Sequence, residues 1–192
     1  MWRNSSEDIY SADIYSSNIF LFRISDKILA EYTKPIFSAL LLRSGEANQR
    51  IYNLAIDTGV KMIKTPRLEE LDVLEVLLTE KITIKEPPKV ALSRVKFTKF
   101  LVESYGISEE KGDPMSVKHL AGFGVNAVQH QDPEVRAAGQ ELVLLLYRVD
   151  QETVRREMPE DNTRTRRSHA TRHVFEKMEE YDKTHGHRRH RT

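Results

Sequence analysis

Apolar residues recur every three or four positions along most of this chain, which is the spacing of one face of a helix. The pattern is clearest after Asp132, where Val135, Leu142 and Val143 share one side of a stretch whose other side is charged or carries amides. Asp132 can cap a helix, and the proline that follows it is tolerated in the first turn. The pattern therefore predicts a helix over Pro133–Tyr147.

Two small residues, Ala138 and Gly139, lie in the middle of that helix. A glycine inside a helix costs about 1 kcal/mol relative to alanine, so we interpret Gly139 as a point where a neighbouring helix approaches closely. The opening Asp-Pro-x-Val-Arg, at residues 132–136, is typical of the second helix of a HEAT repeat.

The same periodicity predicts further helices, joined by short turns rich in polar residues and proline. They span residues 5–22, 26–43, 49–64, 68–81, 89–104, 114–129, 151–157 and 165–183. Strand-like runs are short and have no partner run, so the sequence predicts an all-α protein.

Three of these helices carry specific expectations. Pro35 lies inside the helix over residues 26–43 and should kink it or mark a new start. Asn48 can cap the following helix. The apolar positions of the first helix include Ile9, Ile14, Ile19 and Phe20, and the inward face of the third is expected to include Ile51, Leu54, Ala55, Thr58 and Met62.

The helices are arranged in pairs whose second members begin near Asn48, Lys89 and Pro133, at spacings of 41 and 44 residues. HEAT and armadillo repeats have periods of about 40–47 residues. We therefore predict an α-solenoid of HEAT-like helical pairs over residues 1–183, with a generic helical bundle as the alternative. Residues 184–192 are rich in histidine and arginine and are expected to be a disordered tail.

The chain of 192 residues fits one domain and contains no cysteine, which excludes disulfides and thiolate metal sites. No apolar run reaches the roughly 20 residues that span a bilayer, and the polar start is unlike a secretory signal. We expect a cytosolic or cytoskeletal setting and no membrane partner. The net charge is +1, but residues 164–192 hold 9 Lys and Arg against 4 Asp and Glu, which favours an acidic partner for that end.

No pattern of catalytic residues is present. No serine lies in a Gly-x-Ser-x-Gly turn. His169 and His173 have the helical spacing of two metal ligands, but the residues between them lack the glutamate of a zinc-protease motif. We interpret them as solvated helix residues, and expect no enzyme activity, no metal and no cofactor.

The turns within the helical pairs carry basic residues. In a helical-repeat stack such turns line up along one edge, where a row of positive charge suits an acidic protein surface or a phosphate backbone. Some of these residues, Asp132 and Arg136 especially, could instead cap helices or form pairs that tie adjacent repeats together. The predicted contact residues are Arg43, Ser44, Asn48, Arg50, Lys85, Lys89, His130, Arg136, Arg164, Arg166 and Arg167.

Two stretches carry a family resemblance. One is residues 130–147, in which Glu134-Val135-Arg136 opens the helix, and the other is residues 158–167, followed by Phe175-Glu176 and Tyr181-Asp182. In order and spacing, residues 94–182 resemble the tubulin-binding TOG domain of a family of centrosomal and ciliary-tip proteins, with weaker similarity back to Ile9.

The resemblance implies a flat paddle of HEAT repeats whose turns contact αβ-tubulin or the microtubule lattice without catalysis. It also implies a location at a cilium tip, axoneme or centriole, where other ciliary-tip or centriolar proteins are possible partners. A helical-repeat scaffold that binds another ciliary protein through an apolar groove is the second hypothesis. Nucleic-acid binding through the arginine-rich end is a third; the lack of aromatic residues among residues 185–192 disfavours it.

Overall fold

The computed structural model describes residues 26–63, 73–78, 81–110 and 112–185. The described helices are α2 (Asp26–Arg43), α3 (Gln49–Ile63), α5 (Val73–Leu78), α6 (Pro88–Tyr105), α7 (Val117–Val128), α8 (Pro133–Tyr147), α9 (Gln151–Glu157), the 3-10 helix η1 (Thr165–Arg167) and α10 (His169–His185). Within these ranges the only β feature is an isolated bridge between Ser108 and Ser116. The prediction of an all-α protein is confirmed.

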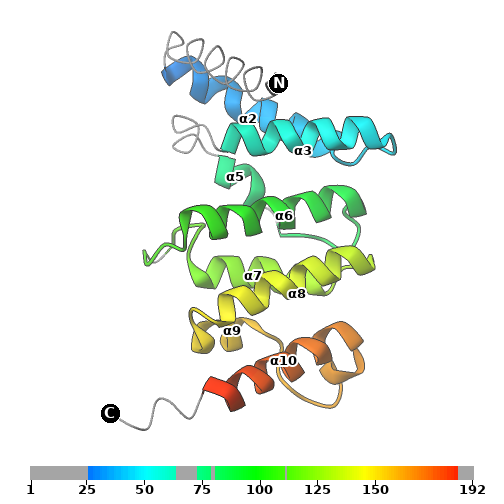
Figure 1. Ribbon diagram of the computed structural model, residues 1–192, viewed down its shortest axis with the longest axis vertical. Helices are drawn as coiled ribbons and strands as arrows, with labels where there is room; N and C mark the ends of the chain where they lie inside the picture. The colour runs from blue at the N-terminus through cyan, green and yellow to red at the C-terminus, as the bar shows by residue number, and fades with distance from the viewer. Residues whose placement is uncertain (1–25, 64–72, 79–80, 111, 186–192) are drawn as a thin grey trace, which may run out of the picture.

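The helices stack as successive pairs along the long axis of the molecule (Figure 1). The pairs are α2/α3, α5/α6, α7/α8 and α9/α10, with η1 in the last turn, so the predicted α-solenoid is also confirmed. One cluster of buried apolar side chains runs through the stack from Phe37 in α2, through Val95 and Leu142, to Met178 in α10. Each layer therefore buries its apolar face against its neighbours, as helical repeats do.

Most predicted helix boundaries agree with the structure because the caps were visible in the sequence. Asp132 accepts the backbone N–H groups of Glu134 and Val135, and α8 begins where predicted. The predictions for α2 and α9 also match residue for residue. However, α2 continues through Pro35, so a new start at that residue is wrong.

Three boundaries differ from the predictions. Helix α7 begins at Val117 instead of residue 114, because the Asp113 carboxylate accepts the N–H of Met115 at 2.7 Å and holds a turn there. The predicted last helix is divided into η1 and α10, and α10 continues to His185, inside the predicted tail. The predicted helix over residues 5–22, the start of the helix over 68–81 and the rest of the tail lie outside the described residues.

The inward face of α3 differs from the predicted one. Leu54 is 67% exposed and Ile51 is 39% exposed, whereas Ala55 is buried. Gly59 is buried too, and a Cβ at this position would come within 2.6 Å of the Phe97 ring in α6. The hydrophobic pattern did not predict this face because Phe97 packs against Gly59, and a glycine contributes no apolar side chain to the pattern.

The interpretation of Gly139 is confirmed. A Cβ at this position would lie 2.8 Å from both the Cβ of Ala127 and the backbone N of Val128 in α7. Helices α7 and α8 therefore meet at a point where only a hydrogen fits.

A buried tyrosine joins the last two layers. The Tyr147 hydroxyl at the end of α8 donates to the Asp182 carboxylate of α10 at 2.9 Å, and Arg155 of α9 contacts the same carboxylate. Burial, and after it the hydrogen bond to Asp182, raises the pKa of Tyr147 to about 12.

We expect Tyr147→Phe to lower the stability of the fold at neutral pH. The variant should also lose less stability than the unchanged protein when the pH is raised. The pKa of the phenol in the unfolded chain is about 10, below its folded value of about 12. The protonated phenol therefore contributes fully below pH 10, and this contribution is lost as the pH rises through 12. Thermal unfolding of both proteins at pH 9 and pH 11.5 measures it. An equal difference between the two proteins at both pH values would contradict this account.

Candidate functional site

The turns within the helical pairs lie along one edge of the stack, on the right of Figure 1. We call this the turn edge; it comprises the turns at residues 44–48, 81–87, 129–132 and 158–168 together with the helix ends next to them. Hydrogen bonds join the first three turns. Lys89 Nζ donates to the carbonyl of Glu46 at 2.7 Å, and His130 Nε2 lies 3.1 Å from the carbonyl of Glu86. The expected alignment of the turns is thus present and held by specific contacts.

Three of the predicted contact residues serve these internal contacts instead. Ser44 is 1% exposed, and its hydroxyl donates to the carbonyl of Leu41 at 2.6 Å. His130 is also 1% exposed; its Nδ1 accepts the N–H of Asp132, so Nε2 carries the proton that it donates to Glu86. Lys89 is half-buried. Ser44 and His130 are therefore structural residues, and their predicted role as partner contacts is wrong.

Arg136 also belongs to the fold. Its guanidinium donates to the carbonyls of His130 and Gln131 in the turn before α8, where the preceding helix has ended. The alternative that Asp132 and Arg136 serve the fold is thus confirmed by the cap that Asp132 forms on α8, but the two residues do not pair, because Arg136 has these separate partners. Neither predicted contact residue of the third turn, His130 or Arg136, is therefore available to contact a partner.

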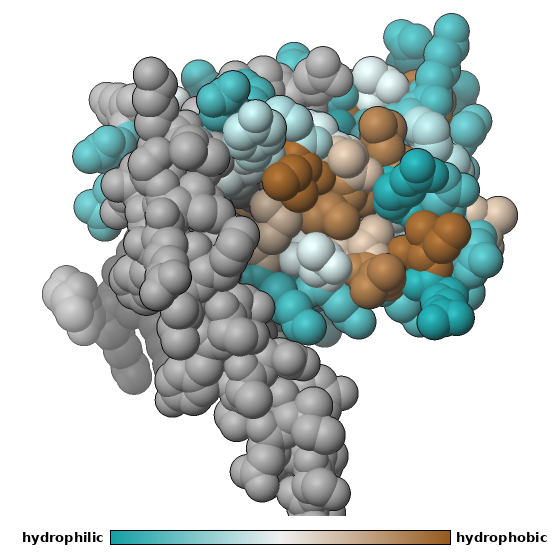
Figure 2. Space-filling view, turned by 90° about the horizontal axis from the view of Figure 1, so that it is seen from above, coloured by the Kyte–Doolittle hydropathy of each residue, from teal (hydrophilic) through white to brown (hydrophobic). Residues whose placement is uncertain are grey.

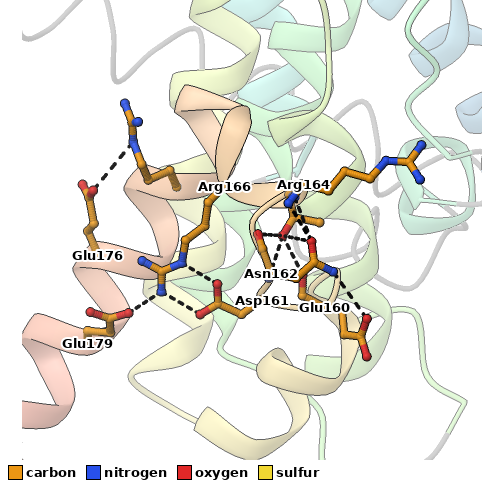
Figure 3. Close-up of polar contacts among 9 residues, drawn as sticks. Glu160, Asp161, Asn162, Arg164, Arg166, Glu176 and Glu179 are labelled. Atoms are coloured by element: carbon orange, nitrogen blue, oxygen red, sulfur yellow. Dashed lines mark hydrogen bonds and ion pairs between the residues drawn. The ribbon is translucent and has the colours of Figure 1, made fainter.

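Arg166 is fixed in the fourth turn by two carboxylates (Figure 3). Its Nη2 lies 2.7 Å from Asp161 Oδ2 and also contacts Glu179 of α10, while its guanidinium lies 5.6 Å above the centre of the Phe175 ring. These hydrogen bonds, first with Asp161 and then with Glu179, raise the pKa of Arg166, and the same contact holds the pKa of Asp161 below its usual value. Arg166 therefore braces the turn against α10.

The remaining predicted cations face solvent. Arg50, Lys85, Arg164 and Arg167 are exposed, and none has an ion pair with another described residue. Figure 3 shows the Arg164 guanidinium directed away from the carboxylates that hold Arg166. Arg43 is exposed as well and pairs with Glu46 at the surface, where such pairs contribute little. The turn edge thus offers available charge in its first, second and fourth turns.

Asn162 and Thr165, which are not among the predicted contact residues, set the shape of the fourth turn. The Asn162 carboxamide oxygen accepts the N–H of Arg164 at 3.0 Å and that of Thr165 at 3.1 Å. Thr165 Oγ1 in turn donates to the carbonyl of Glu160 at 2.6 Å. The Asn-x-x-Thr spacing is the available sequence signal, because such side chains replace backbone partners in turns.

An open depression of about 650 Å³ lies at this turn, and polar and charged residues line it. The lining residues are Asp161, Asn162, Thr163, Arg166, Arg167 and Arg172. The surface suits a charged segment of a partner better than an apolar ligand.

His169 and His173 stack face to face, with ring centres 6.5 Å apart. Over the described ranges, no group of three histidine, aspartate or glutamate side chains is arranged to hold a metal ion. None of the described helices is long and apolar enough to cross a bilayer. The arginine-rich end that was considered for nucleic-acid binding falls mostly in residues 186–192, outside the described ranges.

Asn48 is the remaining predicted contact residue. Its side-chain oxygen accepts the N–H of Arg50 at 2.9 Å, which confirms the cap of α3. Asn48 is exposed, so its amide group still faces solvent on the turn edge.

No family model matches the chain. It is 25% identical to the mouse (Mus musculus) "Centrosomal protein of 104 kDa" over 146 residues, which are 76% of this chain and 15% of that protein. Identity to the human (Homo sapiens) protein of the same name is 23% over 152 residues, 79% of this chain and 16% of that one. The chain therefore spans a small part of the length of the curated relatives it matches.

Two solved structures share the fold of this chain. The TOG domain of human Cep104 superposes with a TM-score of 0.72 at 18% identity, covering 93% of this chain and 70% of that one. A second Cep104 TOG structure gives a TM-score of 0.63 at 19% identity, over 73% of this chain and 54% of that one. The resemblance found in the sequence is confirmed: this chain has the helical-repeat fold of a TOG domain and is similar to that of the 104 kDa centrosomal protein.

Proposed function

We propose that the chain is a non-catalytic module that binds tubulin or microtubules in a centrosomal or ciliary protein, through the turn edge. One observation carries the proposal. Arg50, Lys85, Arg164 and Arg167 are exposed, and each lies in or next to a turn that adjacent helical pairs hold on a single edge. A row of cations on a rigid edge attracts an acidic protein surface and fixes its register. The sequence resemblance to tubulin-binding TOG domains supports αβ-tubulin as that surface.

Charge reversal at the fourth turn tests the proposal. We expect Arg164→Glu with Arg167→Glu to weaken tubulin binding by about tenfold, equivalent to about 1.4 kcal/mol, and to make binding less sensitive to salt. Arg166 is left unchanged because its loss would release Asp161 and Glu179 and disturb the turn itself.

A matched control places the same charge change elsewhere. Lys118 and Arg148 are exposed at the start of α7 and the end of α8, on the edge opposite the turn edge. We expect Lys118→Glu with Arg148→Glu to bind tubulin like the unchanged protein. If both double variants weakened tubulin binding equally, the effect would come from the change in net charge, and a role for the turn edge would be contradicted.

Sedimentation with αβ-tubulin, both as free dimers and as stabilised microtubules, over a salt series measures these affinities. Co-migration with free dimers would indicate a role at growing or capped ends, and binding to polymer alone would indicate lattice decoration. Binding to neither form would overturn the proposal.

A groove between α6 and α8 favours the scaffold as the second candidate function. This hollow of about 460 Å³ has apolar side chains on its floor, including Leu92, Val95 and Ala138, and charged residues such as Lys99 and Glu141 at its rim. An apolar floor suits a helix or peptide of another ciliary protein. In that case binding would survive high salt, and Ala137→Arg, which fills the groove, would abolish it.

A further inference from the structure

The two ends of the helical stack expose different chemistry. Figure 2 shows brown residues gathered on the α2/α3 end. At the other end, over residues 151–185, no large apolar side chain is exposed. A partner of the α10 end is therefore recognised through charge and hydrogen bonds rather than through apolar contacts. The exposed large apolar residues of α2 and α3 are Tyr32, Ile36, Leu42, Ile51 and Leu54.

The depression at the fourth turn lies at this charged end of the stack. Three arginines and one aspartate line it, so the formal charge of its lining is +2. The aspartate is already engaged, because Arg166 donates to both oxygens of Asp161, from Nε to Oδ1 at 2.5 Å and from Nη2 to Oδ2 at 2.7 Å. The positive charge that remains to attract a ligand comes from Arg167 and Arg172.

These two arginines come from different elements and are open to solvent. Arg167 is the last residue of η1, and Arg172 lies in the first turn of α10. Arg167 has no ion pair with another described residue. Arg172 lies 3.7 Å from Glu176, with the two side chains 46% and 55% exposed. Surface pairs of this kind contribute little to stability, so a carboxylate of a ligand can replace Glu176.

Other polar groups of the lining extend this set of donors. The Asn162 amide donates to the exposed carboxylate of Glu160 over a long 3.4 Å, and Thr163 is exposed. Two guanidinium forks, an amide and a hydroxyl can together bind several acceptors. The volume of about 650 Å³ falls within the roughly 300–1,000 Å³ of ligand pockets. A single phosphate or carboxylate would leave most of it to water, whereas a segment with several carboxylates matches the whole set.

We propose that the fourth-turn depression binds a flexible acidic peptide, rich in glutamate or aspartate, through Arg167 and Arg172. The peptide would be a mobile segment of the partner that the turn edge engages, and in this respect the inference rests on the proposed function. Arg50 and Lys85 of the first two turns would contact the folded part of that partner. Two linked contacts bind more tightly than either one alone.

Fluorescence anisotropy of a labelled oligoglutamate peptide, titrated with the full chain, tests the site without tubulin. We expect saturable binding that weakens as salt is raised, and no binding of an oligoglutamine peptide of the same length. Arg172→Glu should weaken oligoglutamate binding by about tenfold, because a charge-assisted hydrogen bond is replaced by repulsion. Equal binding of the two peptides, or no binding of oligoglutamate, would overturn the proposal.

Lys177→Glu is the matched control on the same helix. The side chains of Arg172 and Lys177 are both 46% exposed, and each pairs with a glutamate of α10. Lys177 does not line the depression and lies about 140° around the helix from Arg172, at 3.6 residues per turn. We expect this variant to change the affinity by less than about twofold, since salt screens distant charges. Equal weakening by both variants would mean general charge attraction and would overturn the proposal.

Inorganic phosphate distinguishes a peptide site from a site for one anion. We expect phosphate to displace the labelled peptide only at concentrations far above that of the unlabelled peptide. Displacement by both at equal concentration would assign the depression to a single anion and overturn the proposal.

The outcome can also be separated from that of the tubulin experiment. Arg164 does not line the depression, and Arg172 is not among the residues changed in the tubulin test. Tubulin binding that is insensitive to Arg164→Glu with Arg167→Glu would overturn the role of the turn edge. Oligoglutamate binding that is insensitive to Arg172→Glu would overturn the peptide site.

Discussion

Replacing Arg94 by alanine should lower the free energy of unfolding by about 3–5 kcal/mol. This is the cost of removing one partner of a buried ion pair while the other stays buried. Arg94 is 5% exposed in α6. Its guanidinium donates to the carbonyl of Leu77 at 2.7 and 3.1 Å and to both carboxylate oxygens of Glu86 at 3.0 and 3.1 Å. It also lies 5.4 Å from the centre of the Phe123 ring. The substitution leaves a largely buried carboxylate and the last turn of α5 without these donors.

Two further variants separate this contact from general effects of changing α6. Arg94→Lys should recover only part of the loss, because an ammonium group cannot make the forked contact with both Leu77 and Glu86. Lys96→Ala removes an exposed charge from the same helix and should change stability by no more than about 0.5 kcal/mol. Denaturant unfolding measures all three. A loss below about 1 kcal/mol for Arg94→Ala would show that the pair is not a stabilising element.

The second large effect is expected at Gly139, where valine should destabilise the fold by about 3 kcal/mol, at the upper end of overpacking effects. The new side chain would begin 2.8 Å from the backbone N of Val128, so relief requires α7 and α8 to move apart. Helix backbones cannot rotate away as a flexible side chain can.

Gly122 of α7 offers the matched control for this substitution. The nearest atom to a Cβ at Gly122 is Glu157 Oε2 at 3.6 Å, an ordinary contact. Gly122→Ala should therefore be neutral or should stabilise the helix by up to about 1 kcal/mol. Thermal or denaturant unfolding distinguishes the two positions. Similar losses at both glycines would mean that the tight α7–α8 approach is not what constrains Gly139.

The sequence allowed the fold to be predicted because its signals are local. Asp132 caps α8 and Asp150 caps α9 through contacts within three residues, and the repeat period follows from the spacing of such helices. The inward face of α3 was mistaken because it depends on Phe97, from another layer. The resemblance supplied the family, which the period alone could not.

The candidate site was predicted less well, and for a physical reason. Residue type shows that a turn is basic, but it does not show whether a cation is free. His130 and Arg166 satisfy partners that lie 44 and 13 residues away in the sequence. Arg94 looks like an ordinary helix cation until Leu77 and Glu86 are placed beside it. Arg50, Lys85, Arg164 and Arg167 differ from these residues only in tertiary surroundings, which a sequence pattern does not contain.

The hydrogen bonds from Lys89 to Glu46 and from His130 to Glu86 have a thermodynamic consequence for the turn edge. Each joins one helical pair to the next, so it strengthens the coupling between layers and favours unfolding of the stack as a single unit. A ligand that engages cations from several layers at once finds them in register only in the native state. By mass action, such a ligand raises the melting temperature in proportion to the logarithm of its concentration. The affinity of such a ligand could then be measured from its effect on the unfolding equilibrium.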